Sequence, residues 1–169
     1  MKKLFLFCML TACLSLTLYA QKNIPYPEGL SYECLRKEVA HLPLNDPIKR
    51  NSLSQRLWKA VCICYDYRKN KEYLPQASYE FDGFLGMISL LNYKQISQTS
   101  EFKLLHPLYK QGQTEGLIDS PAYTQFHKEF AGMLDACNKL PLQEQKAREI
   151  TLELIRYCAI HELCIDDSH

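Results

Sequence analysis

The stretch DPIKRNSLSQRLWKAVCICYDYRK, residues Asp46 to Lys69, carries the clearest structural pattern in the chain. Asp46 followed by Pro47 is typical of a helix start, with the aspartate as N-cap and the proline in the first turn. Beyond them, apolar side chains recur at intervals of three and four residues, which is the period of an α-helix; they are Leu53, Leu57, Val61, Cys64 and Tyr65. The sequence therefore predicts one long helix here.

Helix signals extend in both directions from this stretch. Ser31 can cap a short helix that ends near Leu42, and Asp119-Ser120-Pro121 repeats the cap followed by proline. An apolar segment with helical spacing opens at Ser78, and Pro141 precedes a last long helix. These positions predict helices along most of the chain.

Two regions between these helices are harder to assign. Asn70 to Ala77 is polar and contains Pro75, so we expect a connector there. Ser100 can cap a further helix, which Pro107 is expected to kink or end. No segment alternates polar and apolar residues with the period of a strand. The prediction is an all-α protein, a compact bundle of five to six helices.

Composition sets limits on function. The chain has 169 residues, of which 47% are hydrophobic and 23% charged, and its formal net charge is +1. These values are ordinary for a globular protein and exclude wholesale disorder. A balanced charge argues against nucleic acid as a partner, because phosphate binding needs an excess of basic residues.

The first twenty residues predict export. Lys2 and Lys3 precede an apolar run, and Ala20 supplies the small residue expected before a signal-peptidase cut. Two alternatives remain: the run is a membrane anchor, or Leu10-Thr-Ala-Cys13 is a lipobox that attaches a lipid to Cys13. We favour a bacterial signal peptide, residues 1–20, and a single helical domain, residues 21–169, in the periplasm or outside the cell.

Cysteine is the unusual residue of the exported part. Six cysteines follow residue 20, and an even number in an oxidising compartment predicts disulfides. Cys62 and Cys64 point to different sides of one helix and cannot pair with each other. We expect one of them to reach Cys137, so that the bundle is disulfide-stabilised. The disulfide candidates are Cys34, Cys62, Cys64, Cys137, Cys158 and Cys164.

The end of the chain offers an alternative metal site. Cys158, His161 and Cys164 are spaced three residues apart, so two of them share a helix face and the third lies a turn further on. Thiolate and imidazole ligands suit zinc. Two disulfide cysteines with a histidine between them are the favoured interpretation, and no cofactor or metal is predicted.

Other candidates for catalysis lack partners in the sequence. His127 has no recognisable nucleophile motif to serve. Asp66, Glu80 and Asp82 could pair as in a glycosidase, but acidic residues at helix ends are more often solvated or capping groups. The chain is therefore predicted not to be an enzyme.

Tyrosines give the better indication of function. They gather around the connector after the long helix, together with basic residues, and Tyr and Arg are frequent in protein interfaces. The alternative is that these side chains border the core of a small bundle. The candidate partner-binding residues are Tyr65, Tyr67, Arg68, Tyr73 and Tyr79.

Two segments between Asp46 and Leu140 carry a family resemblance: Arg56-Leu-Trp-Lys-Ala-Val-Cys62 and Phe130 to Cys137. They resemble the periplasmic immunity proteins of type VI secretion amidase effectors. The chain differs from that pattern in its additional cysteines, its additional first helix and its long last helix. The resemblance implies a secreted all-α protein that binds a cell-wall amidase and blocks its active site, as a dimer.

The function expected from these observations is an exported, non-enzymatic binding protein, most concretely an immunity or inhibitor protein for a cell-wall-degrading enzyme. One alternative is a small exported metal-binding protein or hydrolase that uses Cys158, His161 and Cys164. The other is an envelope scaffold tethered to the membrane by a lipid on Cys13.

Overall fold

The computed structural model describes residues 23–43, 45–70 and 74–161. Within these ranges every regular element is a helix, which confirms the all-α prediction and its upper count of six. The predicted signal peptide, Cys13, Tyr73 and Cys164 lie outside the described residues. The helices are α2 (Tyr32–Ala40), α3 (Pro47–Asn70), α4 (Pro75–Ile96), α5 (Ser100–Thr114), α6 (Pro121–Cys137) and α7 (Leu142–Ile160).

The predicted caps form three of the helix starts. Ser31 Oγ accepts a hydrogen bond from the Cys34 amide at 3.3 Å at the start of α2. Asp46 Oδ1 accepts from the amides of Ile48 and Lys49 at the start of α3. At the start of α6, Ser120 Oγ accepts from the amide of the third residue along, at 3.1 Å. These bonds satisfy amides that have no partner within the helix.

Proline positions account for the main differences from the predicted boundaries. Helix α4 begins at Pro75, three residues before the expected Ser78, because proline suits the first turn, where its missing N–H costs no hydrogen bond. Helix α5 runs through Pro107 to Thr114, so Pro107 does not end it. Phe102 and Leu105 are buried just before the proline, and Leu108 and Tyr109 are partly buried against the core just after it. Packing therefore holds the helix on both sides of the lost hydrogen bond.

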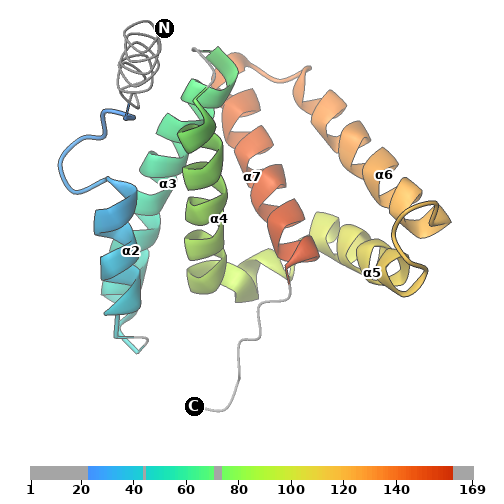
Figure 1. Ribbon diagram of the computed structural model, residues 1–169, viewed down its shortest axis with the longest axis horizontal. Coiled ribbons are helices and arrows are strands. Elements are labelled where there is room, and N and C mark those ends of the chain that lie inside the picture. Colours follow the sequence, from blue (N-terminus) through green and yellow to red (C-terminus); the bar gives the residue numbers. More distant parts are fainter. Residues whose placement is uncertain (1–22, 44, 71–73, 162–169) are drawn as a thin grey trace, which may run out of the picture.

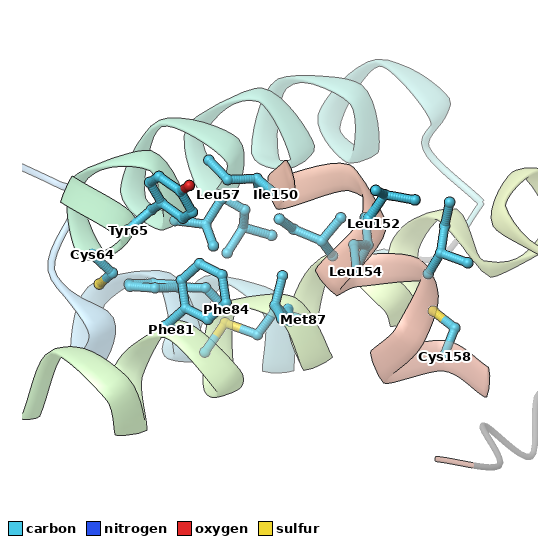
Figure 2. Close-up of a cluster of buried hydrophobic side chains, with 14 of the residues drawn as sticks. Leu57, Cys64, Tyr65, Phe81, Phe84, Met87, Ile150, Leu152, Leu154 and Cys158 are labelled. Atoms are coloured by element: carbon cyan, nitrogen blue, oxygen red, sulfur yellow. The ribbon is translucent and has the colours of Figure 1, made fainter. Parts of the chain in front are cut away.

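Helix α7 lies at the centre of the arrangement. The α3–α4 hairpin and α2 lie on one side of it, and the α5–α6 hairpin lies on the other (Figure 1). Side chains from α3, α4 and α7 meet between these helices, as Figure 2 shows for Leu57, Phe84 and Ile150, each of which is fully buried. None of the described helices is both long and apolar enough to cross a membrane.

The expected disulfides are absent from this part of the chain, so the prediction of a disulfide-stabilised bundle is not supported there. Cys34, Cys62, Cys64, Cys137 and Cys158 are free thiols. Helix α6 packs against α5 and α7 rather than against α3, so neither Cys62 nor Cys64 is bonded to Cys137. Two of the buried thiols instead contact hydroxyl groups: Cys64 Sγ lies 2.7 Å from the Tyr26 hydroxyl, and Cys158 Sγ lies 3.0 Å from Ser89 Oγ.

Candidate functional site

The predicted tyrosine and arginine patch is divided between the core and the surface. Tyr65 is buried, and its hydroxyl donates a hydrogen bond to Glu149 of α7. Tyr67 is half-buried against the core. Arg68 is exposed, with its guanidinium carbon 4.3 Å from the ring centroid of Phe81. Tyr79 is 70% exposed and is the member of the patch most available to a partner.

Tyr79 stands on the rim of a pocket of about 360 Å³ between α4 and α7, which we call the Tyr79 pocket. Its walls carry aromatic and charged side chains from three helices. The lining includes Tyr32 from α2, Tyr79, Asp82 and Gly83 from α4, Glu153, Arg156 and Tyr157 from α7, and His161, which directly follows α7.

Regular spacing on two helices builds this pocket. On α4, Tyr79, Asp82 and Gly83 lie at the first, fourth and fifth positions of one helical face. On α7, Glu153, Arg156 and Tyr157 have the same spacing. Each helix therefore presents one continuous face to the pocket.

Two glycines on α4 allow tyrosines from its neighbours to approach the helix backbone. A Cβ atom on Gly83 would lie 2.4 Å from Cε2 of Tyr32, and one on Gly86 would lie 2.9 Å from the hydroxyl of Tyr157. Such distances are far below van der Waals contact. Gly83 and Gly86 therefore permit close packing, and the rings of Tyr32 and Tyr157 lie against the helix at these two positions.

The charges in the pocket are unequally paired. Arg156 Nε donates to Glu153 Oε2 at 3.1 Å, and the guanidinium carbon lies 5.2 Å from the ring centroid of Phe130. Asp82 has no ion-pair partner in the described part of the chain. Burial raises the pKa of Tyr157, and the nearby Asp82 carboxylate raises it further, which places that negative charge beside the ring.

A second, smaller pocket of about 130 Å³ lies beside the first. Tyr65, Arg68 and Lys69 of α3 line it together with Glu149 and Glu153 of α7. Glu153 lines both pockets, so they adjoin along α7. Three of the five predicted partner-binding residues, Tyr65, Arg68 and Tyr79, therefore border one connected region of the surface.

Glu149 is the fixed charge of the smaller pocket. Burial raises its pKa, but hydrogen bonds from Tyr65, Gln145 and Lys69 outweigh that effect and leave the pKa below its usual value. Lys69 Nζ lies 3.3 Å from Glu149 Oε2. This carboxylate is therefore charged and already has partners on three sides.

The residues considered for metal binding do not gather in the described structure. The Cys158 thiol points to Ser89 of α4 and is buried, whereas His161 is exposed and contacts the ring of Tyr157 at a centroid distance of 4.2 Å. Among the described residues, no group of three His, Cys, Asp or Glu side chains is arranged to hold a metal ion. Cys164 lies outside them.

The carboxylates considered for glycosidase chemistry occupy three separate environments. Asp66 pairs with Lys146 Nζ at 2.6 Å. Glu80 is buried and accepts a hydrogen bond from the Tyr26 hydroxyl at 2.5 Å. Asp82 alone faces the Tyr79 pocket. His127, the other catalytic candidate, is exposed on α6 and packs on the ring of Tyr123.

Burial makes several thiols poor nucleophiles. It raises the pKa of Cys64 to about 12 and raises the pKa values of Cys62, Cys137 and Cys158 as well. Thiols with raised pKa values stay protonated at neutral pH, and the thiolate is the reactive form.

The sequence interpretation missed most residues of α2 and α7 that complete the Tyr79 pocket. Tyr32, Glu153, Arg156 and Tyr157 were not singled out. The available signal was a repeated spacing, in Tyr79, Asp82 and Gly83 on α4 and in Glu153, Arg156 and Tyr157 on α7. Only the packing of α4 against α7 shows that the two sets face one pocket.

In comparisons with protein-family models, curated protein sequences and solved structures, the chain has no significant match.

Proposed function

We propose that this protein is an exported, non-enzymatic binding protein whose Tyr79 pocket and its rim form the docking site for a protein partner. The observation that carries the proposal is the placement of Tyr79. This large aromatic side chain is 70% exposed at the edge of a pocket, and the opposite wall carries charged groups of α7. Exposed tyrosines next to pockets are typical of the residues that dominate binding energy in protein interfaces.

The most concrete form of this function is an immunity or inhibitor protein for a cell-wall-degrading enzyme, such as an amidase effector. The expected export of the chain would place it in the compartment where such an enzyme acts. The protonated state of the buried thiols supports a binding role over cysteine catalysis. The resemblance of Arg56–Cys62 and Phe130–Cys137 to the amidase immunity proteins is a further reason to look for this class of partner.

The test is capture of a partner followed by an activity assay. Tagged protein without residues 1–20 is mixed with envelope and secreted fractions, and bound proteins are identified by mass spectrometry. A partner that hydrolyses peptidoglycan, and loses that activity when one equivalent of this protein is added, supports the proposal. A captured enzyme that keeps its full activity at that stoichiometry contradicts the inhibitor function.

Matched variants connect the result to the pocket. Tyr79→Ala removes the exposed ring at the rim, and Leu142→Ala removes an exposed side chain at the start of α7, where it is 86% exposed and does not line the pocket. We expect Tyr79→Ala to reduce capture strongly and Leu142→Ala to preserve it. Equal losses in both variants would show that the Tyr79 pocket is not the docking site.

A further inference from the structure

The Tyr79 pocket has the composition of a site for a positive charge. The rings of Tyr32 and Tyr79 lie 5.9 Å apart between centroids at an angle of 57°, and Tyr157 adds a third ring from α7. Aromatic faces attract cations, because the π-electrons give each face a partial negative charge. Carboxylates beside such rings strengthen that preference.

Asp82 is the carboxylate left available for a ligand. Glu153, the other acidic residue of the pocket, already accepts a hydrogen bond from Arg156 at 3.1 Å. Asp82 has no ion-pair partner within the described ranges. Burial is the larger cause that raises the pKa of Tyr157, and the nearby charge of Asp82 is the next. Asp82 also lines the pocket, so its negative charge lies beside the tyrosine rings.

An anionic ligand fits the pocket less well. Arg156 is the guanidinium among the lining residues, and its charge is engaged by Glu153 on one side and by the Phe130 ring on the other. Arg36, which lies near Tyr32 on α2, is 3.6 Å from Glu33. A second anion in the pocket would also be repelled by Asp82.

We propose that the Tyr79 pocket binds a lysine or arginine side chain presented by the protein partner. This inference rests on the proposed function, because it names the chemistry of the group that the partner inserts. The ring faces contact the cation, and Asp82 supplies the opposite charge. The small size of the pocket, about 360 Å³, suits one side chain better than a folded element.

The inference is tested with a probe that carries the charge but no other part of the partner. The probe is N-acetyl-L-arginine amide, and its neutral isostere N-acetyl-L-citrulline amide serves as the matched control. Binding to the protein without residues 1–20 is followed by the backbone amide signals of Gly83 and Gly86 in ¹H–¹⁵N spectra. We expect the arginine probe to shift both signals in a saturable manner. The citrulline probe should bind with an affinity at least about threefold lower.

Two substitutions separate the contributions of the site. Asp82→Asn keeps the shape of the side chain and removes its charge, and it should weaken binding of the arginine probe about threefold, as expected for an exposed ion pair. Tyr79→Ala should weaken it by about two- to fivefold through loss of a cation–π contact. Asp135→Asn, an exposed acid on α6 outside the pocket, is the control and should leave binding unchanged.

The outcomes distinguish this inference from the proposed function. Absence of shifts with the arginine probe, equal shifts with the citrulline probe, or unchanged affinity in Asp82→Asn would each overturn the cation site. A partner captured through Tyr79 while the probe fails would leave the binding function in place and exclude the cation. Specific binding of the arginine probe without any captured partner would support the site and count against the proposed function.

Discussion

The contact between Gly83 and Tyr32 predicts that alanine is less favourable at position 83 than at an open site inside a helix. In the interior of a helix, replacing glycine by alanine gains about 1 kcal/mol of stability when the new methyl group meets nothing. At Gly83 the added Cβ would lie 2.4 Å from Tyr32 Cε2 and 2.9 Å from its Cζ. The ring must then leave its place against Phe84, where the two centroids are 5.4 Å apart. Overpacking of this kind costs about 1–3 kcal/mol.

Subtracting the helix gain, we expect Gly83→Ala to lower the free energy of unfolding by up to about 2 kcal/mol, or the melting temperature by up to about 8 °C. Gly132→Ala is the matched control, because Gly132 also lies inside a helix and an added Cβ there meets nothing within 4 Å. It should raise the free energy of unfolding by about 0.5–1 kcal/mol. Thermal and urea unfolding followed by circular dichroism measure both changes.

A double-mutant cycle identifies Tyr32 as the cause. Once Tyr32→Ala has removed the ring, Gly83→Ala should become stabilising, by about the amount found at Gly132. The coupling between the two positions is then about 1–3 kcal/mol, which is the cost of overpacking. The described packing of Tyr32 on α4 is wrong if Gly83→Ala changes the free energy of unfolding equally with and without Tyr32. It is also wrong if Gly83→Ala is as stabilising as Gly132→Ala in the unmodified protein.

Three other predictions concern the remainder of the bundle. The pKa of Glu101 is lowered, chiefly by a hydrogen bond from Arg148, so the stability that this carboxylate contributes is present above its usual pKa and is lost as pH falls through the lowered pKa. Glu101→Gln should therefore flatten the decrease of melting temperature between about pH 5 and pH 3. An unchanged decrease would contradict this assignment. Iodoacetamide added in denaturant without reductant should alkylate the five described thiols, and peptide mapping that finds disulfides among them would contradict the free state; they are Cys34, Cys62, Cys64, Cys137 and Cys158. Phe126→Ala, at a fully buried position in contact with the rings of Tyr109 and Tyr123, should lower the free energy of unfolding by about 3–5 kcal/mol. A loss below about 1 kcal/mol would show that the α5–α6 hairpin is not packed as described.

The helix starts were predictable because caps act locally. Asp46, Ser31 and Ser120 each bond to an amide within three residues, so the signal and its effect lie together in the sequence. Of the two effects expected of Pro107, a kink or an end, the end is wrong, because α5 continues to Thr114. The burial of Phe102 and Leu105 helps to hold the helix, and that burial is a tertiary effect. Local sequence patterns therefore predict the hydrogen bonds of the helix caps, whereas packing between helices determines whether a helix continues through a proline.

The state of the cysteines and the residues of the Tyr79 pocket also depend on tertiary packing, which local sequence patterns do not predict. Composition predicted disulfides, but the thiols of Cys64 and Cys158 point to hydroxyl groups of other elements. Tyr79 was predicted because other tyrosines and basic residues lie near it in the sequence. Tyr32 and Tyr157 line the same pocket but belong to α2 and α7, which are distant from Tyr79 in the sequence. No local pattern gives the contact between α4 and α7 on which the pocket depends.

The most direct test of the docking site is the affinity of the captured cell-wall enzyme for two forms of this protein. The dissociation constant is measured by titration calorimetry for the unmodified protein and for Tyr79→Ala, after unfolding experiments have shown that the two are equally stable. Loss of an interface tyrosine of this kind costs about 2 kcal/mol, so we predict binding that is weaker by about 30-fold. Affinity within about twofold of the unmodified protein would contradict the assignment of the Tyr79 pocket as the partner-binding site.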